Sequence, residues 1–171
     1  MRRTRQKDRE WPGPRSPWDE IVPGLWMGGH HWTDAAGELR PVVVGSEFDL
    51  VISLWTRSGH GPDVHVNHLV RELPDGPLTA VELRGVQELC RAGVFALSTG
   101  QRVLVRCRSG YNRSGLVVAQ MLIERGLPAG EAVALVRRRR SPAALRNDAF
   151  TGYLAAGLDV AALLVELDPL G

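Results

Sequence analysis

Residues 102–125 place a short apolar strand, a polar loop and an apolar helix in direct succession, and this stretch constrains the fold most. Arg102–Arg106 has the apolar run of a central parallel strand. Residues 113–125 are apolar on nearly every side when arranged as a helix, so the helix is expected in the middle of the protein. A strand that leads through a tight loop into a buried helix predicts an α/β architecture.

The rest of the chain alternates in the same way. Strands are predicted at 21–28, 48–55 and 64–70, and residues 29–47 stay unassigned, with a helical turn expected near 34–39. Thr79 is the expected N-cap of a helix that runs to about Ser98, before Gly100. Two further helices are predicted over 128–140 and 146–166. The expected fold is a central, mostly parallel sheet flanked by helices.

Length and charge predict one domain with a basic tail. A chain of 171 residues suits a single domain, assigned here to 18–171, after a flexible, Pro-rich tail at 1–17. Residues 1–15 hold six Lys or Arg and two acidic residues, whereas the other 156 hold 15 basic and 17 acidic residues. Because the body has no basic excess, a nucleic-acid partner is not expected.

Two cysteines do not make a disulfide framework at this length. The charged start lacks a leader-like apolar segment, and no run of about 18 apolar residues predicts a membrane span. These observations predict a cytoplasmic protein with free thiols.

The loop after the strand has the composition of an anion-binding site built around a cysteine. Its backbone N–H groups and the following helix N-terminus are expected to hold a phosphate, and Arg113 adds a fork for two oxygens. The expected phosphate-binding residues are Arg108, Ser109, Gly110, Tyr111, Asn112 and Arg113. Positive surroundings favour the thiolate of Cys107, which would then attack the bound phosphoryl group.

This stretch resembles the signature loop of the protein tyrosine phosphatase superfamily, which has a cysteine, five residues, an arginine and then serine or threonine. Here these are Cys107, Arg113 and Ser114, and Gly110 also matches. The resemblance covers about residues 18–158 and is to the small, atypical dual-specificity branch. It implies a phosphatase that acts on phosphorylated proteins at serine, threonine or tyrosine.

The resemblance also implies a general acid upstream of the cysteine. Asp75, in Leu73-Pro-Asp75-Gly-Pro77, lies 32 residues before Cys107 and fits, while Asp63 and Glu72 remain alternatives. In the implied mechanism Cys107 forms a phosphocysteine, Asp75 protonates the leaving oxygen, and Ser114 hydrogen-bonds the departing sulfur. No metal and no cofactor are expected.

The chain departs from the family at Arg106, because the position before the nucleophile is usually histidine. An arginine that points inward at a strand end needs a carboxylate or several carbonyls as partners, and the alternative is that Arg106 points to solvent.

Other readings remain open. Gly110-Tyr-Asn-Arg-Ser-Gly115 also resembles the loop of cysteine-dependent RNA 5'-triphosphatases, and the same chemistry would serve a phosphoinositide phosphatase. A phosphate-binding pseudophosphatase and a rhodanese-like sulfur transferase are further alternatives. The histidines are poorly spaced for a metal site, Cys90 is expected in the core, and the arginines at 137–140 are expected to form a solvated face.

Overall fold

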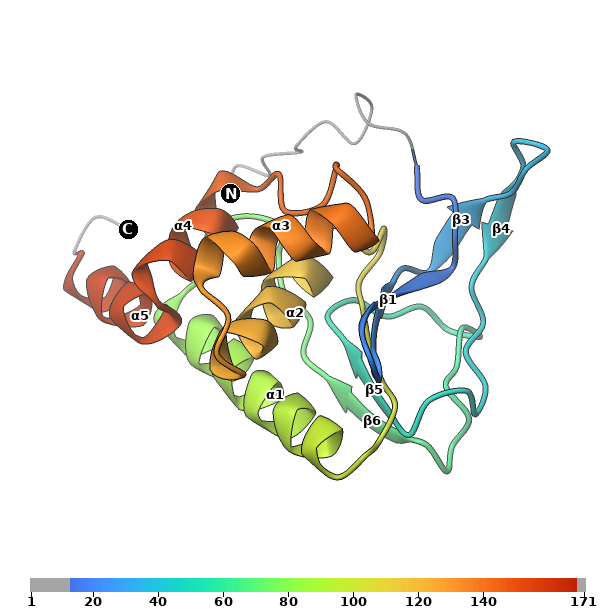
Figure 1. Cartoon of the computed structure of the whole chain (residues 1–171), viewed down its shortest axis with the longest axis horizontal. Coiled ribbons are helices and arrows are strands. Elements are labelled where there is room, and N and C mark those ends of the chain that lie inside the picture. The colour runs from blue at the N-terminus through green and yellow to red at the C-terminus, as the bar shows by residue number, and fades with distance from the viewer. Residues whose placement is uncertain (1–12, 169–171) are drawn as a thin grey trace.

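A five-stranded sheet with the strand order β1-β2-β7-β5-β6 forms the centre of the fold in the computed structural model, which describes residues 13–168 (Figure 1). The strands are β1 (Trp18–Val22), β2 (Leu25–Gly28), β5 (Leu50–Ser53), β6 (Asn67–Val70) and β7 (Val103–Arg106). Within this sheet only β1 and β2 pair antiparallel, while β2, β7, β5 and β6 run parallel. The predicted central, mostly parallel sheet is confirmed.

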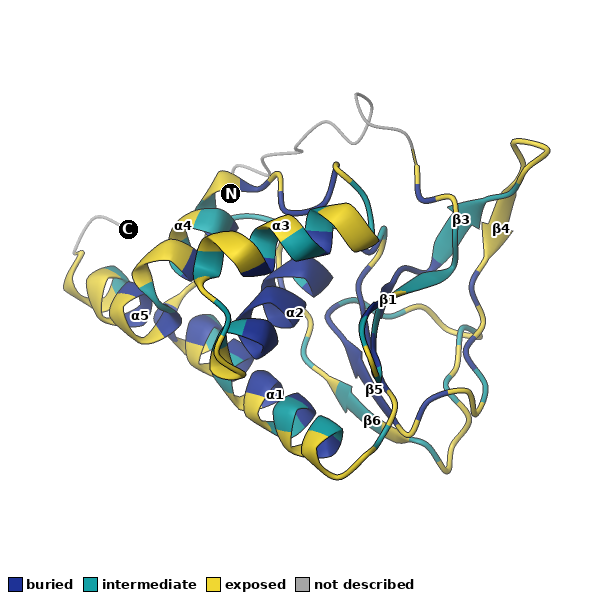
Figure 2. Cartoon of the chain, viewed as in Figure 1, coloured by how far each residue is buried: buried dark blue, intermediate teal, exposed yellow. Residues whose placement is uncertain are grey.

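The helices lie on one side of this sheet (Figure 1), where α1, α2 and α3 contact its strands and α4 and α5 pack against the other helices. They are α1 (Ala80–Ser98), α2 (Arg113–Glu124), α3 (Ala129–Arg139), α4 (Asp148–Ala156) and α5 (Leu158–Leu167). Nine of the twelve residues of α2 are buried, so this helix lies in the core as predicted (Figure 2). Thr79 and Glu82 form a capping box at the start of α1, which confirms the predicted N-cap.

The opposite face of the sheet is covered by residues 42–48, of which all but Phe48 were left unassigned by the sequence. Side chains alternate along each strand, so Val51 and Leu104 point away from the helices. They pack with Val42, Val44 and Phe48 in a second, smaller core. Residues 42–48 therefore cover this face of the sheet without forming a helix.

Two predicted elements are each divided in the structure. The single strand expected at 21–28 is a hairpin of β1 and β2, because Gly24 adopts a φ of 86°. The single helix expected at 146–166 is broken into α4 and α5 at Gly157, which has a φ of 94°. No single helix in residues 13–168 is long and apolar enough to cross a membrane, and only the bent α4–α5 pair passes when counted together.

A second hairpin occupies the place of the helical turn expected near 34–39, so that expectation is wrong. Strands β3 (His31–Thr33) and β4 (Leu39–Pro41) pair antiparallel and project beside the main sheet (Figure 1). The Oδ1 atom of Asp34 accepts hydrogen bonds from the backbone N–H of Ala36 and of Glu38, both at 2.9 Å. These contacts close the connecting turn with local polar groups.

Most of the predicted tail, residues 1–12, lies outside the described residues. Its last part contacts the domain: the backbone N–H of Thr33 donates to the Pro14 carbonyl at 2.7 Å. Pro14 is buried, and Ser16 accepts a hydrogen bond from Arg140. Residues 14–17 are therefore packed against the domain.

Candidate active site

The loop 107–112 lies at the carboxyl edge of the parallel strands, between the end of β7 and the start of α2. Arg106, the last residue of β7, pairs with Gly28 of β2 and Ser53 of β5, so three strands end beside the loop. Ligand sites of parallel α/β sheets lie at this edge.

The carbonyl oxygens of all six loop residues accept hydrogen bonds, five of them from His30, Arg140 and Leu145 and that of Asn112 from the first turn of α2. The pairs are Cys107 with His30 Nδ1 (2.9 Å), Arg108 with His30 N (2.8 Å), Ser109 with Arg140 Nη2 (3.2 Å), Gly110 with Arg140 Nε (3.1 Å), Tyr111 with Leu145 N (3.2 Å) and Asn112 with Leu116 N (2.8 Å). In a trans peptide unit the N–H points opposite to the C=O. The N–H groups of residues 108–113 therefore point to the inside of the loop, as an anion nest requires.

Cys107 lies at the bottom of this nest with a hydroxyl beside its sulfur. The residue is 2 % exposed, and its Sγ is 3.3 Å from the Oγ of the fully buried Ser114. A hydroxyl at this distance can donate a hydrogen bond to a thiolate and stabilise its charge. The nest, the N-terminus of α2 and Ser114 thus all favour negative charge at the same place.

Arg113 begins α2 with its guanidinium turned toward the loop that carries Asp75. One Nη1–H donates to the Leu73 carbonyl at 3.1 Å, while Nε is buried and has no hydrogen-bond partner among the described residues. A buried guanidinium nitrogen without a partner is costly, so this geometry is consistent with a donor held for an oxyanion.

Gly110 is required where the loop passes close to Gly28 at the end of β2. Its φ is 75°, and an added Cβ would lie 2.5 Å from the carbonyl carbon and oxygen of Gly28. Neither the conformation nor the space admits a side chain at this position.

Asp75 is brought to the loop by two asparagine side chains. Its Oδ2 accepts a hydrogen bond from Asn112 Nδ2 at 3.1 Å, and its Oδ1 accepts one from Asn147 Nδ2 at 2.8 Å. The two alternative acids are engaged elsewhere: Glu72 accepts from Thr56, and Asp63 accepts from Ser46. Of the three carboxylates, Asp75 is the one hydrogen-bonded to a loop residue.

Arg106 points inward and is satisfied by backbone carbonyls, so the expectation of carbonyl partners is confirmed and the solvent alternative is wrong. Its side chain donates to Ser53 Oγ (3.0 Å), the His60 carbonyl (3.0 Å) and the Gly61 carbonyl (2.6 Å). Burial lowers the pKa of Arg106 to about 10, which leaves it charged at neutral pH. Arg106 thereby ties β7 to the loop at 60–61.

His30 is a site residue that the sequence did not identify. It is fully buried, it packs edge-on against Trp55 and it stacks on His60. Burial is the main reason why its pKa falls from 6.5 to about 4, and the nearby charge of Arg106 adds to it. Neutral His30 can donate from Nδ1 to the Cys107 carbonyl, a contact that joins residues 77 positions apart.

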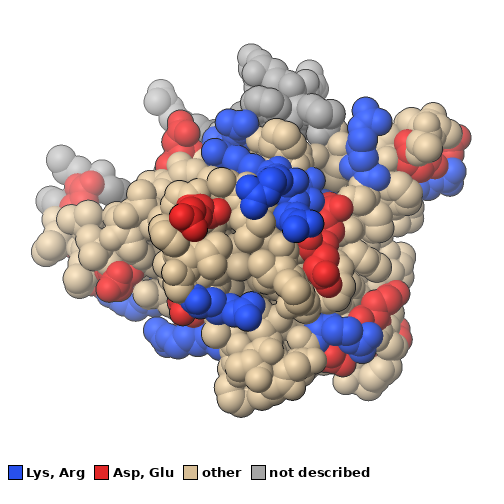
Figure 3. Space-filling model, in the orientation of Figure 1, with Lys and Arg blue, Asp and Glu red and all other residues tan. Residues whose placement is uncertain are grey.

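The arginines at 137–140 do not form one solvated face, so that expectation is wrong for two of them. Arg137 donates to the carbonyls of Ala144 and Leu145, and the Arg140 side chain is only 1 % exposed. Arg138 and Arg139 are exposed, and basic side chains gather at this end of α3 in Figure 3. Cys90 is fully buried in the main core, as expected.

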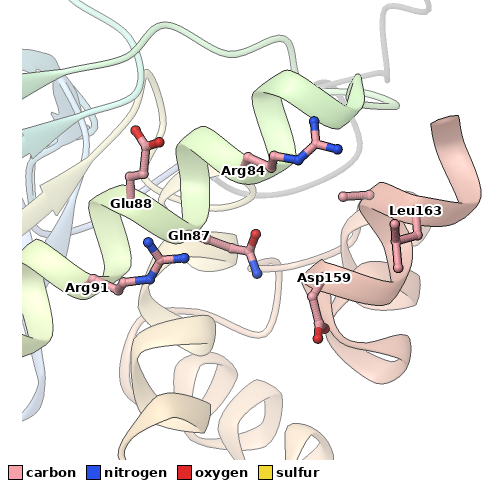
Figure 4. A pocket seen from close by; sticks show the side chains of 7 residues that line it. Arg84, Gln87, Glu88, Arg91, Asp159 and Leu163 are labelled. Atoms are coloured by element: carbon pink, nitrogen blue, oxygen red, sulfur yellow. The ribbon is translucent and has the colours of Figure 1, made fainter.

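A separate groove lies between α1 and α5 (Figure 4). It is lined by Arg84, Gln87, Glu88, Arg91, Asp159, Ala162 and Leu163, and includes none of the loop residues.

Within residues 13–168 no group of three or more His, Cys, Asp or Glu side chains is arranged to hold a metal ion.

No family model and no curated protein sequence matches the chain. Solved structures do match. Human DUSP28 has a TM-score of 0.67 at 23 % identity, covering 90 % of this chain and 99 % of its own. A putative mouse dual specificity phosphatase, complexed with zinc tungstate, has a TM-score of 0.63 at 22 % identity, covering 91 % and 94 %. The human tyrosine phosphatase-like serine/threonine/tyrosine-interacting protein has a TM-score of 0.61 at 21 % identity, covering 86 % and 97 %. The chain therefore has the fold of the small dual-specificity phosphatases.

Proposed function

We propose that this chain, whose fold is that of the dual-specificity phosphatases, is a cysteine-dependent phosphatase. The observation that carries the proposal is the loop 107–112, which begins with Cys107 and whose six carbonyls are all hydrogen-bonded to groups outside the loop, so that its N–H groups face inward. An anion nest alone would bind phosphate. A nest with a thiol at its base and a carboxylic acid, Asp75, tied to its rim can also transfer the phosphoryl group.

In the first proposed step the Cys107 thiolate attacks phosphorus. An S–P bond forms, the ester P–O bond breaks, and Asp75 gives its proton to the departing oxygen. The loop N–H groups and Arg113 hold the three remaining phosphoryl oxygens, where negative charge is stabilised by donors already in place.

In the second proposed step water hydrolyses the phosphocysteine. Asp75, now a carboxylate, takes a proton from the attacking water, the P–O bond forms and the S–P bond breaks. Ser114 stabilises the released thiolate, since its Oγ is 3.3 Å from the sulfur. Apart from water, every group that the two steps use comes from the chain. The reaction also needs Cys107 as a free thiol, which suits a reducing compartment.

Phosphorylated proteins are the proposed substrates. The small size of the fold and the resemblance to the dual-specificity branch favour phosphoserine and phosphothreonine beside phosphotyrosine. The body of the chain outside residues 1–15 carries 15 basic and 17 acidic residues, which gives no general attraction for RNA.

The test is turnover of an aryl phosphate by the full chain, followed by a panel of phosphopeptides, a phosphoinositide and a 5'-triphosphate RNA. Cys107→Ser should abolish turnover, and quenching the wild-type reaction in acid should leave a phosphate adduct on Cys107, seen by peptide mass spectrometry. The control is Cys90→Ala, which removes the other cysteine and should retain turnover.

Turnover by Cys107→Ser would contradict the mechanism. Faster turnover of RNA or phosphoinositide than of every phosphopeptide would reassign the substrate. Phosphopeptide binding without turnover would instead favour the pseudophosphatase.

A further inference from the structure

We propose that Arg140 is a positioning residue that holds the catalytic loop in its anion-binding conformation, and that Ser16 and Asp19 complete this device. The inference rests on the proposed function, because it assigns a role to a residue that does not touch the substrate. Ser16 and Asp19, which follow the basic N-terminal residues, thereby become part of the site.

The guanidinium of Arg140 joins two parts of the chain that are far apart in sequence. On one side Nε donates to the Gly110 carbonyl at 3.1 Å, and Nη2 donates to the Ser109 carbonyl at 3.2 Å. On the other side Nη1 donates to Asp19 Oδ2 at 2.8 Å and to the Ser16 carbonyl at 3.0 Å. Every nitrogen of the fork is used, and the side chain is 1 % exposed.

These contacts decide the direction of two peptide units in the nest. The Ser109 and Gly110 carbonyls point to Arg140, so the N–H groups of the same peptide units, which belong to Gly110 and Tyr111, point inward. Without Arg140, both carbonyls would lack their donor. A peptide flip next to glycine is sterically easy, and it would turn a carbonyl oxygen toward the bound anion. The nest would then repel the phosphate that it now attracts.

Asp19 and Ser16 fix the fork on its far side. Asp19 forms an ion pair with Arg140, and its Oδ2 also accepts a hydrogen bond from Ser16 Oγ at 2.7 Å. This partly buried carboxylate offsets the burial of the arginine charge and sets the plane of the guanidinium. A lysine would keep the charge but could not place donors on both sides at once.

Arg139, the residue before Arg140, provides a matched control because its side chain is exposed. The variants are Arg140→Ala, Arg140→Lys, Asp19→Asn and Arg139→Ala in the full chain. The measurements are kcat and KM with an aryl phosphate, the dissociation constant of tungstate by calorimetry, and the melting temperature.

Arg140→Ala should lower kcat by about 100-fold, the size of effect expected when reacting groups are misplaced by about 1 Å. Its tungstate affinity should fall at least about tenfold, since oriented nest donors are lost. Arg140→Lys should show most of both losses, Asp19→Asn should show smaller losses of the same kind, and Arg139→Ala should stay within about twofold of wild type.

Wild-type kcat and tungstate affinity in Arg140→Ala, measured well below its melting temperature, would overturn the inference even if that temperature falls. If Arg140→Ala does not fold, Arg140→Lys and Asp19→Asn decide in the same way: wild-type kcat and affinity in both would overturn it. A wild-type chain that neither binds tungstate nor hydrolyses the ester would overturn the proposed function, and this result is distinct because it needs no variant.

Discussion

The buried, neutral state of His30 makes the packing beneath the loop 107–112 sensitive to acid. Its pKa is 6.5 in an exposed setting and about 4 in the folded protein, mainly because burial disfavours the charged ring. Between these values the unfolded chain binds a proton that the folded chain does not. The contribution of neutral His30 to the free energy of unfolding is therefore complete above about pH 6.5 and is lost as the pH falls toward 4.

The magnitude follows from the two pKa values. Relative to pH 7.5, His30 should lower the free energy of unfolding at pH 5 by about 2 kcal/mol. Burial also lowers the pKa of His60 and of His68, so the wild-type chain should lose more than this share. The share of His30 must therefore be isolated by substitution.

His30→Asn isolates it, because asparagine does not titrate and its Nδ2 can still donate to the Cys107 carbonyl. Urea unfolding followed by tryptophan fluorescence at pH 7.5 and pH 5 gives the acid loss for each protein. The variant should lose about 2 kcal/mol less than wild type over this interval. His65→Asn, at an exposed histidine, serves as the control.

An acid loss in His30→Asn equal to that of wild type would refute the reasoning, because it would mean that His30 does not resist protonation in the folded protein. Comparison of His30→Asn with His30→Leu at pH 7.5 tests the hydrogen bond itself. The leucine variant leaves the Cys107 carbonyl without its donor and should be less stable than the asparagine variant by about 1 to 3 kcal/mol.

Three further predictions concern the loop 107–112 and the proposed general acid, Asp75. Arg106→Ala removes the donor from two backbone carbonyls and should lower the free energy of unfolding by about 3 kcal/mol in urea titration; a loss under about 1 kcal/mol would show that the carbonyls find other donors. Gly110→Ala should abolish measurable tungstate binding, because the added Cβ would lie 2.5 Å from Gly28 backbone atoms; wild-type affinity would count against the described loop. Asp75→Asn should slow hydrolysis of alkyl phosphates by about 100-fold more than that of aryl phosphates with good leaving groups, and equal slowing would point to Glu72 or Asp63 as the acid.

The sequence by itself determined the elements whose information is local. The strand, loop and helix of residues 103–125 follow from an apolar run, a polar interruption and a second apolar run. All three patterns lie within one short stretch of sequence. Thr79 was predicted as an N-cap from the local sequence, and the structure adds Glu82, three residues later, as the second half of a capping box. Asp75 came from a resemblance in loop composition and spacing, and the structure places it against Asn112.

Only the tertiary structure decided what holds that loop. His30 reaches Cys107 across 77 residues, Arg140 reaches Ser109 across 31, and Arg106 reaches the His60 carbonyl across 46. Each of these side chains binds a backbone carbonyl, and every residue has one, so residue types in the sequence do not mark the partner. The same limit applied to residues 42–48, which cover one face of the sheet because folding brings them there and not because of a periodic pattern of their own.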